Sequence, residues 1–393
     1  MLKEVYLPRF SFEERDRRYK SVRQQMVDRG LDCLVIPHST GDWDNYQSDV
    51  RYLTGIGGHC TGAAVVFPLE GDVIAIVRDP QRVAWWKLAQ NWVSEVRGKK
   101  GNWSDAIVQA VRDLGRERSR VGVVGLRDVL RDPEGTVSFT EWSNITHELK
   151  DAKFVDVTVM MQDVRLQKSP EEINFLERAA DIADAASLAL FETARPGVSE
   201  HEVYAAMVAG MIRSGGEIPT MGLFVAEPEP SQTYLMPTFR KLERNDIIFT
   251  EFDAKYAGYM AQGDETVCVG TPPDEYLQLY SVSFECFNMV LEAMKPGVLW
   301  AELLRMYIDR VERAGFKPGF GLGHGMGLAE DGPFIRTGVE TKDVVLEGQC
   351  FILKPSVRSH DGKRSNRAGN TIVVEKSGAR RLGKLDMKMR CLC

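Results

Sequence analysis

Four side chains suited to proton transfer lie in three short segments in the second half of the chain. The segment DIIFTEFDAKYAGYMAQGDETVCVG is rich in carboxylates, GLGHGMG contains a histidine, and CFILKP contains a lysine. Carboxylate, imidazole and amine groups are those that enzymes use as general acids and bases. We therefore interpret Glu251, Asp264, His324 and Lys354 as candidate catalytic residues.

The neighbourhood of each candidate gives a local reason for this interpretation. The glycines around His324 allow the backbone to approach a ligand closely, which favours a catalytic or substrate-orienting imidazole over a simple turn residue. Asp264 is interpreted as functional, because acids with perturbed pKa values cluster in clefts. Asp253 is expected at the end of a strand, where a carboxylate is either a turn residue or a ligand for substrate. Both readings of Asp253 stay open.

The order and spacing of these segments resemble those of a known family. Together with LEGQCFILKP and NTIVVEKSG, they are similar to the creatinase/aminopeptidase P family, whose fold is called pita-bread. RYLTG and VRLQKSPEE in the first half also resemble family segments. Members that cleave peptides hold two metal ions with two Asp, one His and two Glu side chains. The matching positions here are Glu251, Gln262, His324, Lys354 and Gly369, and only the histidine is retained.

These replacements predict that the chain holds no dinuclear metal centre and no other cofactor. Two metal ions at one site need several carboxylates. Gln262 offers only a neutral oxygen, and Lys354 has no lone pair while it is protonated. In this alignment Lys354 would lie near Glu251 and Asp264, which would hold it charged. The alternative is one ion bound by Glu251, Asp253, Asp264 and His324.

Further positions are expected to contact substrate because of the resemblance. Asp331 stands where the family often has a second histidine, and Tyr234 is nearest to the position of the histidine base of creatinase. We also expect a homodimer, in which residues 51–61 close the active site of the partner. The predicted substrate-binding residues are Asp253, Gln262, Tyr234, His59, Arg51, Tyr52 and Asp331.

The resemblance implies a metal-independent, creatinase-like hydrolase acting on a C–N bond of a small molecule. The acidic residues favour a substrate with a cationic amino, amidino or guanidino group. One alternative is a lyase of the dimethylsulfoniopropionate-lyase type, which also belongs to the family and has a segment like Glu251-Phe252-Asp253. Another alternative is a non-catalytic pita-bread binding protein.

The elements that must position these residues form two predicted domains. Residues 1–160 are expected to form an α/β domain, and residues 161–393 an α+β domain of the pita-bread type. Capping boxes at Ser169 and Ser199 each predict the start of a helix. Strands are expected at 32–37, 63–68, 72–77, 120–125, 222–226, 246–252 and 266–269, and helices at 12–29, 105–114, 169–194, 199–213, 274–294 and 300–314.

Composition restricts the class of protein further. The 393 residues carry a net charge of −6 with lysine and arginine dispersed, which argues against nucleic-acid and anionic-membrane surfaces. No apolar run reaches the ~20 residues of a membrane span, and residues 1–20 lack the apolar core of a signal peptide. The seven cysteines are scattered without metal-like spacing, so we expect a cytoplasmic protein. The sequence has no P-loop, GxSxG or dinucleotide fingerprint.

Overall fold

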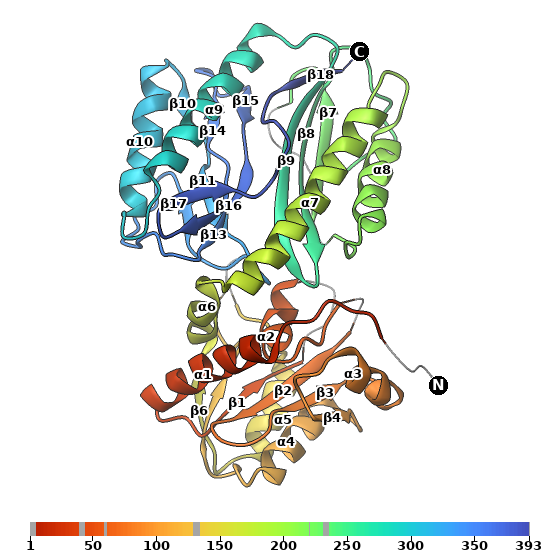
Figure 1. Cartoon of the computed structure of the whole chain (residues 1–393), viewed down its shortest axis with the longest axis vertical. Coiled ribbons are helices and arrows are strands. Elements are labelled where there is room, and N and C mark those ends of the chain that lie inside the picture. The colour runs from red at the N-terminus through yellow and green to blue at the C-terminus, as the bar shows by residue number, and fades with distance from the viewer. Residues whose placement is uncertain are drawn as a thin grey trace. The chain divides into compact units, whose positions relative to one another are not determined.

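The computed structural model describes residues 5–38, 44–58, 61–128, 134–219, 221–230 and 236–392, with the side chains of 44–46 left out. The chain divides into two compact units, Met1–Arg165 and Leu166–Cys393. Figure 1 shows the order of the elements along the chain. Within the described residues, no helix combines the length and apolar character that crossing a membrane requires.

The first unit is a mixed six-stranded sheet with helices on both faces. The strand order is β4-β3-β2-β1-β5-β6, and the pairings of β1 with β5, β3 with β4 and β5 with β6 are parallel. The strands are β1 Cys33–Ile36, β2 Ala63–Pro68, β3 Ile74–Val77, β4 Glu95–Gly98, β5 Arg120–Val123 and β6 Lys153–Asp156, and the helices are α1 Phe12–Asp28, α2 Asp44–Thr54, α3 Val83–Ala89, α4 Trp103–Asp113, α5 Phe139–Glu148 and α6 Thr158–Leu166.

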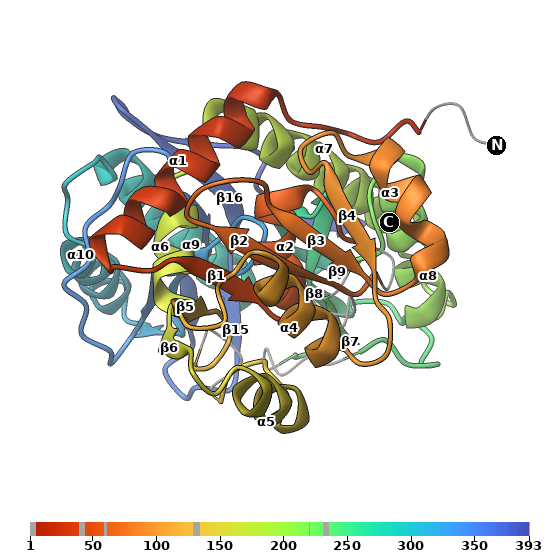
Figure 2. The same ribbon diagram turned by 90° about the horizontal axis from the view of Figure 1, so that it is seen from below.

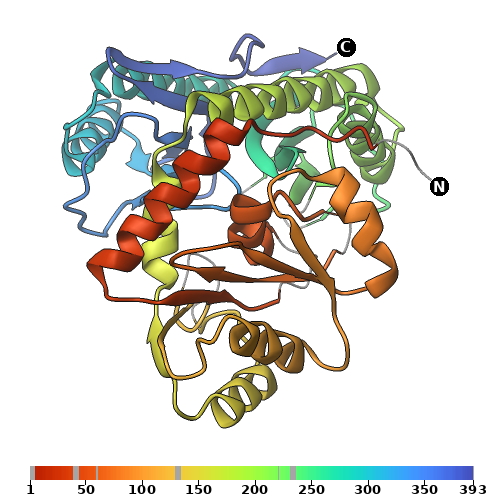
Figure 3. The ribbon, with the colours of Figure 1, turned by 60° about the horizontal axis from the view of Figure 1, so that its bottom comes forward.

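Apolar side chains on alternate strand positions fix the two faces of this sheet. Val35 and Val121 pack with Ile107 of α4 and Ile145 of α5, so α4 and α5 cover one face (Figure 3). Figure 2 shows the same sheet from below. On the opposite face, the ring of Tyr19 in α1 meets Phe67 edge-on. The predicted α/β layer architecture is therefore confirmed.

The second unit consists of two helix pairs, each packed on strands. Both predicted capping boxes are present, and they start α7 Pro170–Thr193 and α8 Glu200–Arg213. α7 and α8 share a core with β7 Gly222–Glu227, β8 Ile247–Tyr256 and β9 Tyr259–Val269, and β18 Arg390–Leu392 extends this sheet to the order β18-β9-β8-β7.

The other helix pair, α9 Asp274–Ala293 and α10 Trp300–Arg313, covers the remaining strands (Figure 1). One sheet has the order β12-β11-β13-β16-β17 and a smaller one the order β10-β14-β15. Their strands are β10 Lys317–Pro318, β11 Gly321–Gly325, β12 Phe334–Arg336, β13 Cys350–Leu353, β14 Ser356–Arg358, β15 Ser365–Arg367, β16 Asn370–Glu375 and β17 Gly378–Arg381.

The hairpin of β8 and β9 is longer than predicted, which corrects the expected place of Asp253. The strands meet at a two-residue turn, Ala257-Gly258, in which both residues have positive φ. This is the geometry of a type I′ hairpin turn. Asp253 therefore lies inside β8, opposite Gln262, and not at a strand end. Polar residues here face the candidate site, so the strand lacks the apolar alternation that would have revealed its length.

Candidate active site

One face of the β8–β9 hairpin presents four of the predicted polar side chains together. Glu251 is the register partner of Asp264, and Asp253 is the register partner of Gln262. Residues two apart on a strand, and residues paired across strands, point to the same face of a sheet. All four therefore project to one side.

Lys354 joins this group from the residue that follows β13. Its Nζ donates hydrogen bonds to Glu251 Oε1 at 2.7 Å and to Gln262 Oε1 at 2.5 Å. The Lys354 and Glu251 side chains are only 7% and 6% exposed. The lysine is therefore a buried member of the cluster, as the sequence predicted.

Arg367, in β15, is a second cation that the sequence analysis missed. Its Nη2 donates to Glu251 Oε2 at 2.5 Å, and its Nε lies 2.5 Å from Asp264 Oδ2. Burial lowers the pKa of Arg367 to about 9, so the guanidinium is still a cation at neutral pH. A signal was present: Arg367 lies two residues before Gly369, and in an extended segment such residues face the same way. Lys354, Glu251, Arg367 and Asp264 thus alternate between basic and acidic side chains, and we call them the charge cluster.

Gly369 provides the space that this cluster occupies. A Cβ atom at this position would lie 2.9 Å from Lys354 Cβ and 3.0 Å from Asp264 Cβ. Contacts this short would force the backbone or both neighbours to move. In this arrangement of the backbone, position 369 therefore has no room for a side chain.

His324 belongs to a second polar group, which also contains Glu330 and Asp253. Its Nδ1 is 3.2 Å from Gly325 O, and if Nδ1 donates its proton there, Nε2 carries the lone pair. Glu330 Oε2 is 3.9 Å from the same Nδ1. Gln262 connects the two groups, because its Nε2 donates to Asp253 Oδ1 at 2.9 Å while its Oε1 accepts from Lys354.

The acids of both groups have altered proton affinity. Burial raises the pKa of Asp253 to about 8, and the negative charges of Glu330 and Glu251 add to that effect. Burial also raises the pKa of Asp264 well above its ordinary value, with Glu251 adding to the rise and Lys354 opposing it. The Arg367 guanidinium at Asp264 Oδ2 favours the ionised form as well.

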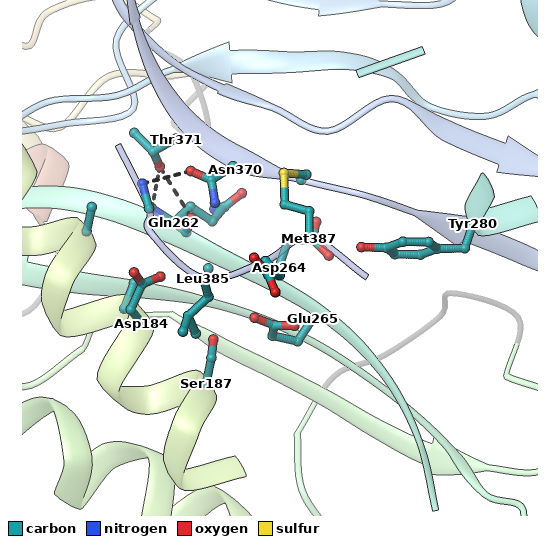
Figure 4. A pocket seen from close by; sticks show the side chains of 16 residues that line it. Asp184, Ser187, Gln262, Asp264, Glu265, Tyr280, Asn370, Thr371, Leu385 and Met387 are labelled. Atoms are coloured by element: carbon teal, nitrogen blue, oxygen red, sulfur yellow. Dashed lines mark hydrogen bonds between the residues drawn. The ribbon is translucent and has the colours of Figure 1, made fainter. Parts of the chain in front are cut away.

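A pocket adjoins β9 and is lined by two of the predicted site residues and by Gly369 (Figure 4). Gln262, Asp264 and Gly369 line it, beside Asp184 and Ser187 of α7 and the 383–387 segment. Its acidic lining residues are Asp184, Asp264, Glu265 and Asp386. Burial raises the pKa of Glu265 to about 7, although a hydrogen bond with Ser187 acts to lower that pKa.

Comparison with known families accounts for this fold. Residues 174–376 match the model of metallopeptidase family M24, and residues 18–167 match the creatinase/prolidase N-terminal domain. The chain belongs to family M24. The predicted recognition and fold class, a creatinase-type α/β domain followed by a pita-bread domain, are thus confirmed.

Several named relatives of this M24 protein are hydrolases. An Xaa-Pro dipeptidase of Pyrococcus furiosus is 27% identical over 293 residues, which span 70% of this chain and 83% of that protein. A creatinase of Bacillus sp. (strain B-0618) is 24% identical over 399 residues, spanning 96% and 92%. The crystal structure of the prolidase from Pyrococcus horikoshii has a TM-score of 0.78 at 21% identity and covers 94% of this chain and 99% of that one.

The residues at the family's metal positions do not fit a dinuclear centre. Lys354 puts an ammonium group between Glu251 and Gln262, and Arg367 takes the other oxygen of Glu251. Across the described part of the chain, no three His, Cys, Asp or Glu side chains are grouped so that they could hold a metal ion. Two fixed cations and a neutral amide are unsuitable partners for dications.

The other predicted site residues have separate surroundings. Asp331 is buried, with its Oδ2 3.7 Å from Lys168 Nζ. Tyr52 is fully buried in the first unit, where the Arg18 guanidinium lies 4.4 Å from the centre of its ring. Arg51 precedes it in α2. His59 and Tyr234 fall outside the described residues.

Proposed function

We propose that this M24 protein is a metal-independent hydrolase that cleaves a C–N bond of a small molecule with a cationic group. The environment of Lys354 carries this proposal most directly. Its ammonium group lies among side chains at the positions where metal-dependent relatives have ligands, and Arg367 brings a second positive charge. Two fixed cations can stabilise negative charge that develops on a substrate oxygen.

Lys354 is assigned the role of binding that oxygen. An ammonium group has three N–H donors, and its bonds to Glu251 and Gln262 use two of them. We assign the third to the substrate oxygen. Arg367 donates a hydrogen bond to Glu251 Oε2 and so fixes the carboxylate that holds Lys354 in place.

His324 and Asp264 are assigned the two proton transfers. His324 Nε2 takes a proton from the attacking water, and Glu330 stabilises the imidazolium that results. Asp264, whose pKa burial raises, gives a proton to the leaving nitrogen. The hydroxide left by the first transfer bonds to the carbon, and the C–N bond breaks as the nitrogen takes the proton from Asp264. His324 then passes its extra proton to Asp264, which restores both groups.

Further acids near the charge cluster support a cationic substrate. The charge of Glu330 helps to raise the pKa of Asp253, and Asp331 Oδ2 lies 3.7 Å from Lys168 Nζ. A cationic group would therefore gain favourable interactions with Asp253 and Glu330, and it would lower the raised pKa of Asp253.

A non-catalytic binding protein is the second candidate. The observation in its favour is that Lys354, Glu251, Arg367 and Asp264 already neutralise one another. Such a network can stabilise a cleft that binds a ligand without transforming it.

An activity screen with and without a chelator tests the two candidates. The purified full-length protein is incubated with amidines, guanidino acids, N-carbamoyl amino acids and short peptides, and products are identified by mass spectrometry. We expect products that together equal substrate plus one water, unchanged rates with chelator, and loss of turnover in His324→Ala. Stoichiometric metal in elemental analysis, with activity abolished by chelator, would overturn metal independence. Ligand binding without any product would favour the binding protein.

We also propose that the protein works as a homodimer. Closed pairs with two-fold symmetry are the commonest assemblies of soluble chains. In that assembly the 51–61 segment of one chain would border the site of the other.

A further inference from the structure

Two cysteines face each other across the last strand pair of the chain. β18 pairs in parallel with β9, and Cys391 is the register partner of Cys268. Neighbouring strands lie about 4.8 Å apart. This spacing is within the range of about 4.4–6.8 Å between the Cα atoms of disulfide-bonded cysteines.

The flanking residues show that both cysteine side chains point to the same face of the sheet. Val267 and Val269 pack into the core with α7, and Leu392 packs against that core. The Arg390 guanidinium lies 4.3 Å from the ring centre of Phe191 in α7. Because alternate strand residues face opposite sides, Cys268 and Cys391 both face away from α7.

The core clusters agree with this assignment. Cys268 packs with Ile247, Phe249 and Tyr276 in a separate cluster on the other face. The pKa of the Cys268 thiol is raised to about 12, first by burial and second by the Cys391 charge. The two thiols are therefore near enough to interact electrostatically.

The two thiols differ in their exposure to solvent, which decides the one that an oxidant reaches first. Cys268 is fully buried, whereas Cys391 is exposed. Of the cysteines within the described ranges, the others (Cys33, Cys286 and Cys350) are also buried. A soluble oxidant can therefore reach Cys391 first.

We propose that Cys268 and Cys391 form a reversible disulfide under oxidising conditions, which fastens β18 to β9. Hydrogen peroxide oxidises the Cys391 thiol to a sulfenic acid, with loss of one water. The Cys268 sulfur then attacks the Cys391 sulfur, so that the S–S bond forms, the S–O bond breaks and a second water leaves. One peroxide and two thiols thus give one disulfide and two waters.

The bond would connect the end of the chain to the strand that carries Gln262 and Asp264. It closes a loop of more than a hundred residues, which restricts the unfolded chain. Oxidation is therefore expected to raise the Tm of the full-length protein by roughly 5 °C.

Peptide mapping of the oxidised protein tests the proposal. The full-length protein is treated with hydrogen peroxide or with dithiothreitol and digested with trypsin under non-reducing conditions. We expect an intact mass lower by two hydrogens, and a cross-link between the peptide after Arg390 and the peptide containing Cys268. Fragmentation must separate Cys268 from Cys286, which lies in the same peptide. Dithiothreitol should reverse the change.

Two serine variants serve as matched controls. Cys391→Ser, at an exposed position, should fold normally and lose both the cross-link and the rise in Tm. Cys393→Ser should retain both. A cross-link between Cys391 and Cys393, a bond to Cys286, or overoxidation of Cys391 without any cross-link would each overturn the proposal.

Discussion

Lys354 Nζ and Glu251 Oε1 are 2.7 Å apart, and both side chains are more than nine-tenths buried. Removing Lys354 leaves two buried acids, Glu251 and Asp264, with Arg367 as their remaining cationic partner in the charge cluster, and an incompletely compensated buried charge is costly. We expect Lys354→Met to lower the free energy of unfolding by about 3–5 kcal/mol, measured by urea denaturation. Adding Glu251→Gln to that variant should recover part of the loss.

An exposed lysine pair gives the matched control for this experiment. Lys384 Nζ pairs with Asp181, and the lysine side chain is 72% exposed. Lys384→Met should cost at most about 1 kcal/mol. Equal losses for the two lysine variants would show that Lys354 is not part of a buried charge network.

His324→Ala and Asp264→Asn should each reduce turnover on the true substrate by about 10²-fold or more, because each removes a proton-transfer group. Steady-state kinetics on the substrate found by the screen measures the loss. His147→Ala is the control, because the His147 side chain is 83% exposed and should leave kcat unchanged. Normal rates in both site variants would refute the assigned roles.

Stability should fall as pH rises toward 8. The pKa of Asp253 is about 8 in the folded protein, against an ordinary value of 3.8. Between these two pH values, folded Asp253 keeps a proton that the unfolded chain has released. The unfolded state therefore binds fewer protons, and the free energy of unfolding declines by up to about 1.4 kcal/mol per pH unit from this group. Glu265, with a pKa raised to about 7, adds to the decline below that pH.

Urea denaturation between pH 5.5 and 9 measures this slope. Asp253→Asn should make it shallower, because an amide cannot lose the proton. Asp361→Asn should not change it, because hydrogen bonding by Ser359 lowers the pKa of that exposed carboxyl. An unchanged slope in Asp253→Asn would mean that Asp253 is ionised in the folded protein.

Thr371 should position Gln262 through the backbone. The backbone N–H of Gln262 donates to Thr371 Oγ1 at 2.9 Å, and the Thr371 hydroxyl lies 3.3 Å from the backbone carbonyl oxygen of Gln262. The Thr371 side chain therefore joins β9 to β16. Thr371→Val should cost about 1–3 kcal/mol, because it leaves buried backbone groups unsatisfied. Thr146→Val, which removes hydroxyl bonds within α5 only, should cost less. Equal costs in urea denaturation would contradict this role.

Light scattering should give twice the chain mass of 44.1 kDa under the conditions of the activity assay. The expectation follows from the prevalence of two-fold pairs. If the 51–61 segment contributes to the partner's site, mixing His324→Ala with an inactive Arg51→Ala variant should restore part of the activity. Full activity at the monomer mass would refute the dimer.

Local signals in the sequence were sufficient for much of the fold. The capping boxes at Ser169 and Ser199 depend on contacts between residues three apart, so both helix starts were predictable. Asp253 was misplaced because β8 continues through polar residues that face the site. Arg367 was missed because its partners, Glu251 and Asp264, are more than a hundred residues away in sequence. Such pairing is decided by packing, and the two-residue spacing from Gly369 indicates only the side to which Arg367 points.

The absence of a side chain at 369 has a consequence for how this protein could have diverged. Any Cβ there would lie within about 3 Å of Lys354 Cβ and Asp264 Cβ, so an alanine at 369 already requires a shift of its neighbours. Because every residue except glycine has a Cβ, exchanging Lys354 alone would not relieve these contacts. A lineage with a side chain at 369 is therefore expected to have shifted the backbone around 264, 354 and 369 as well.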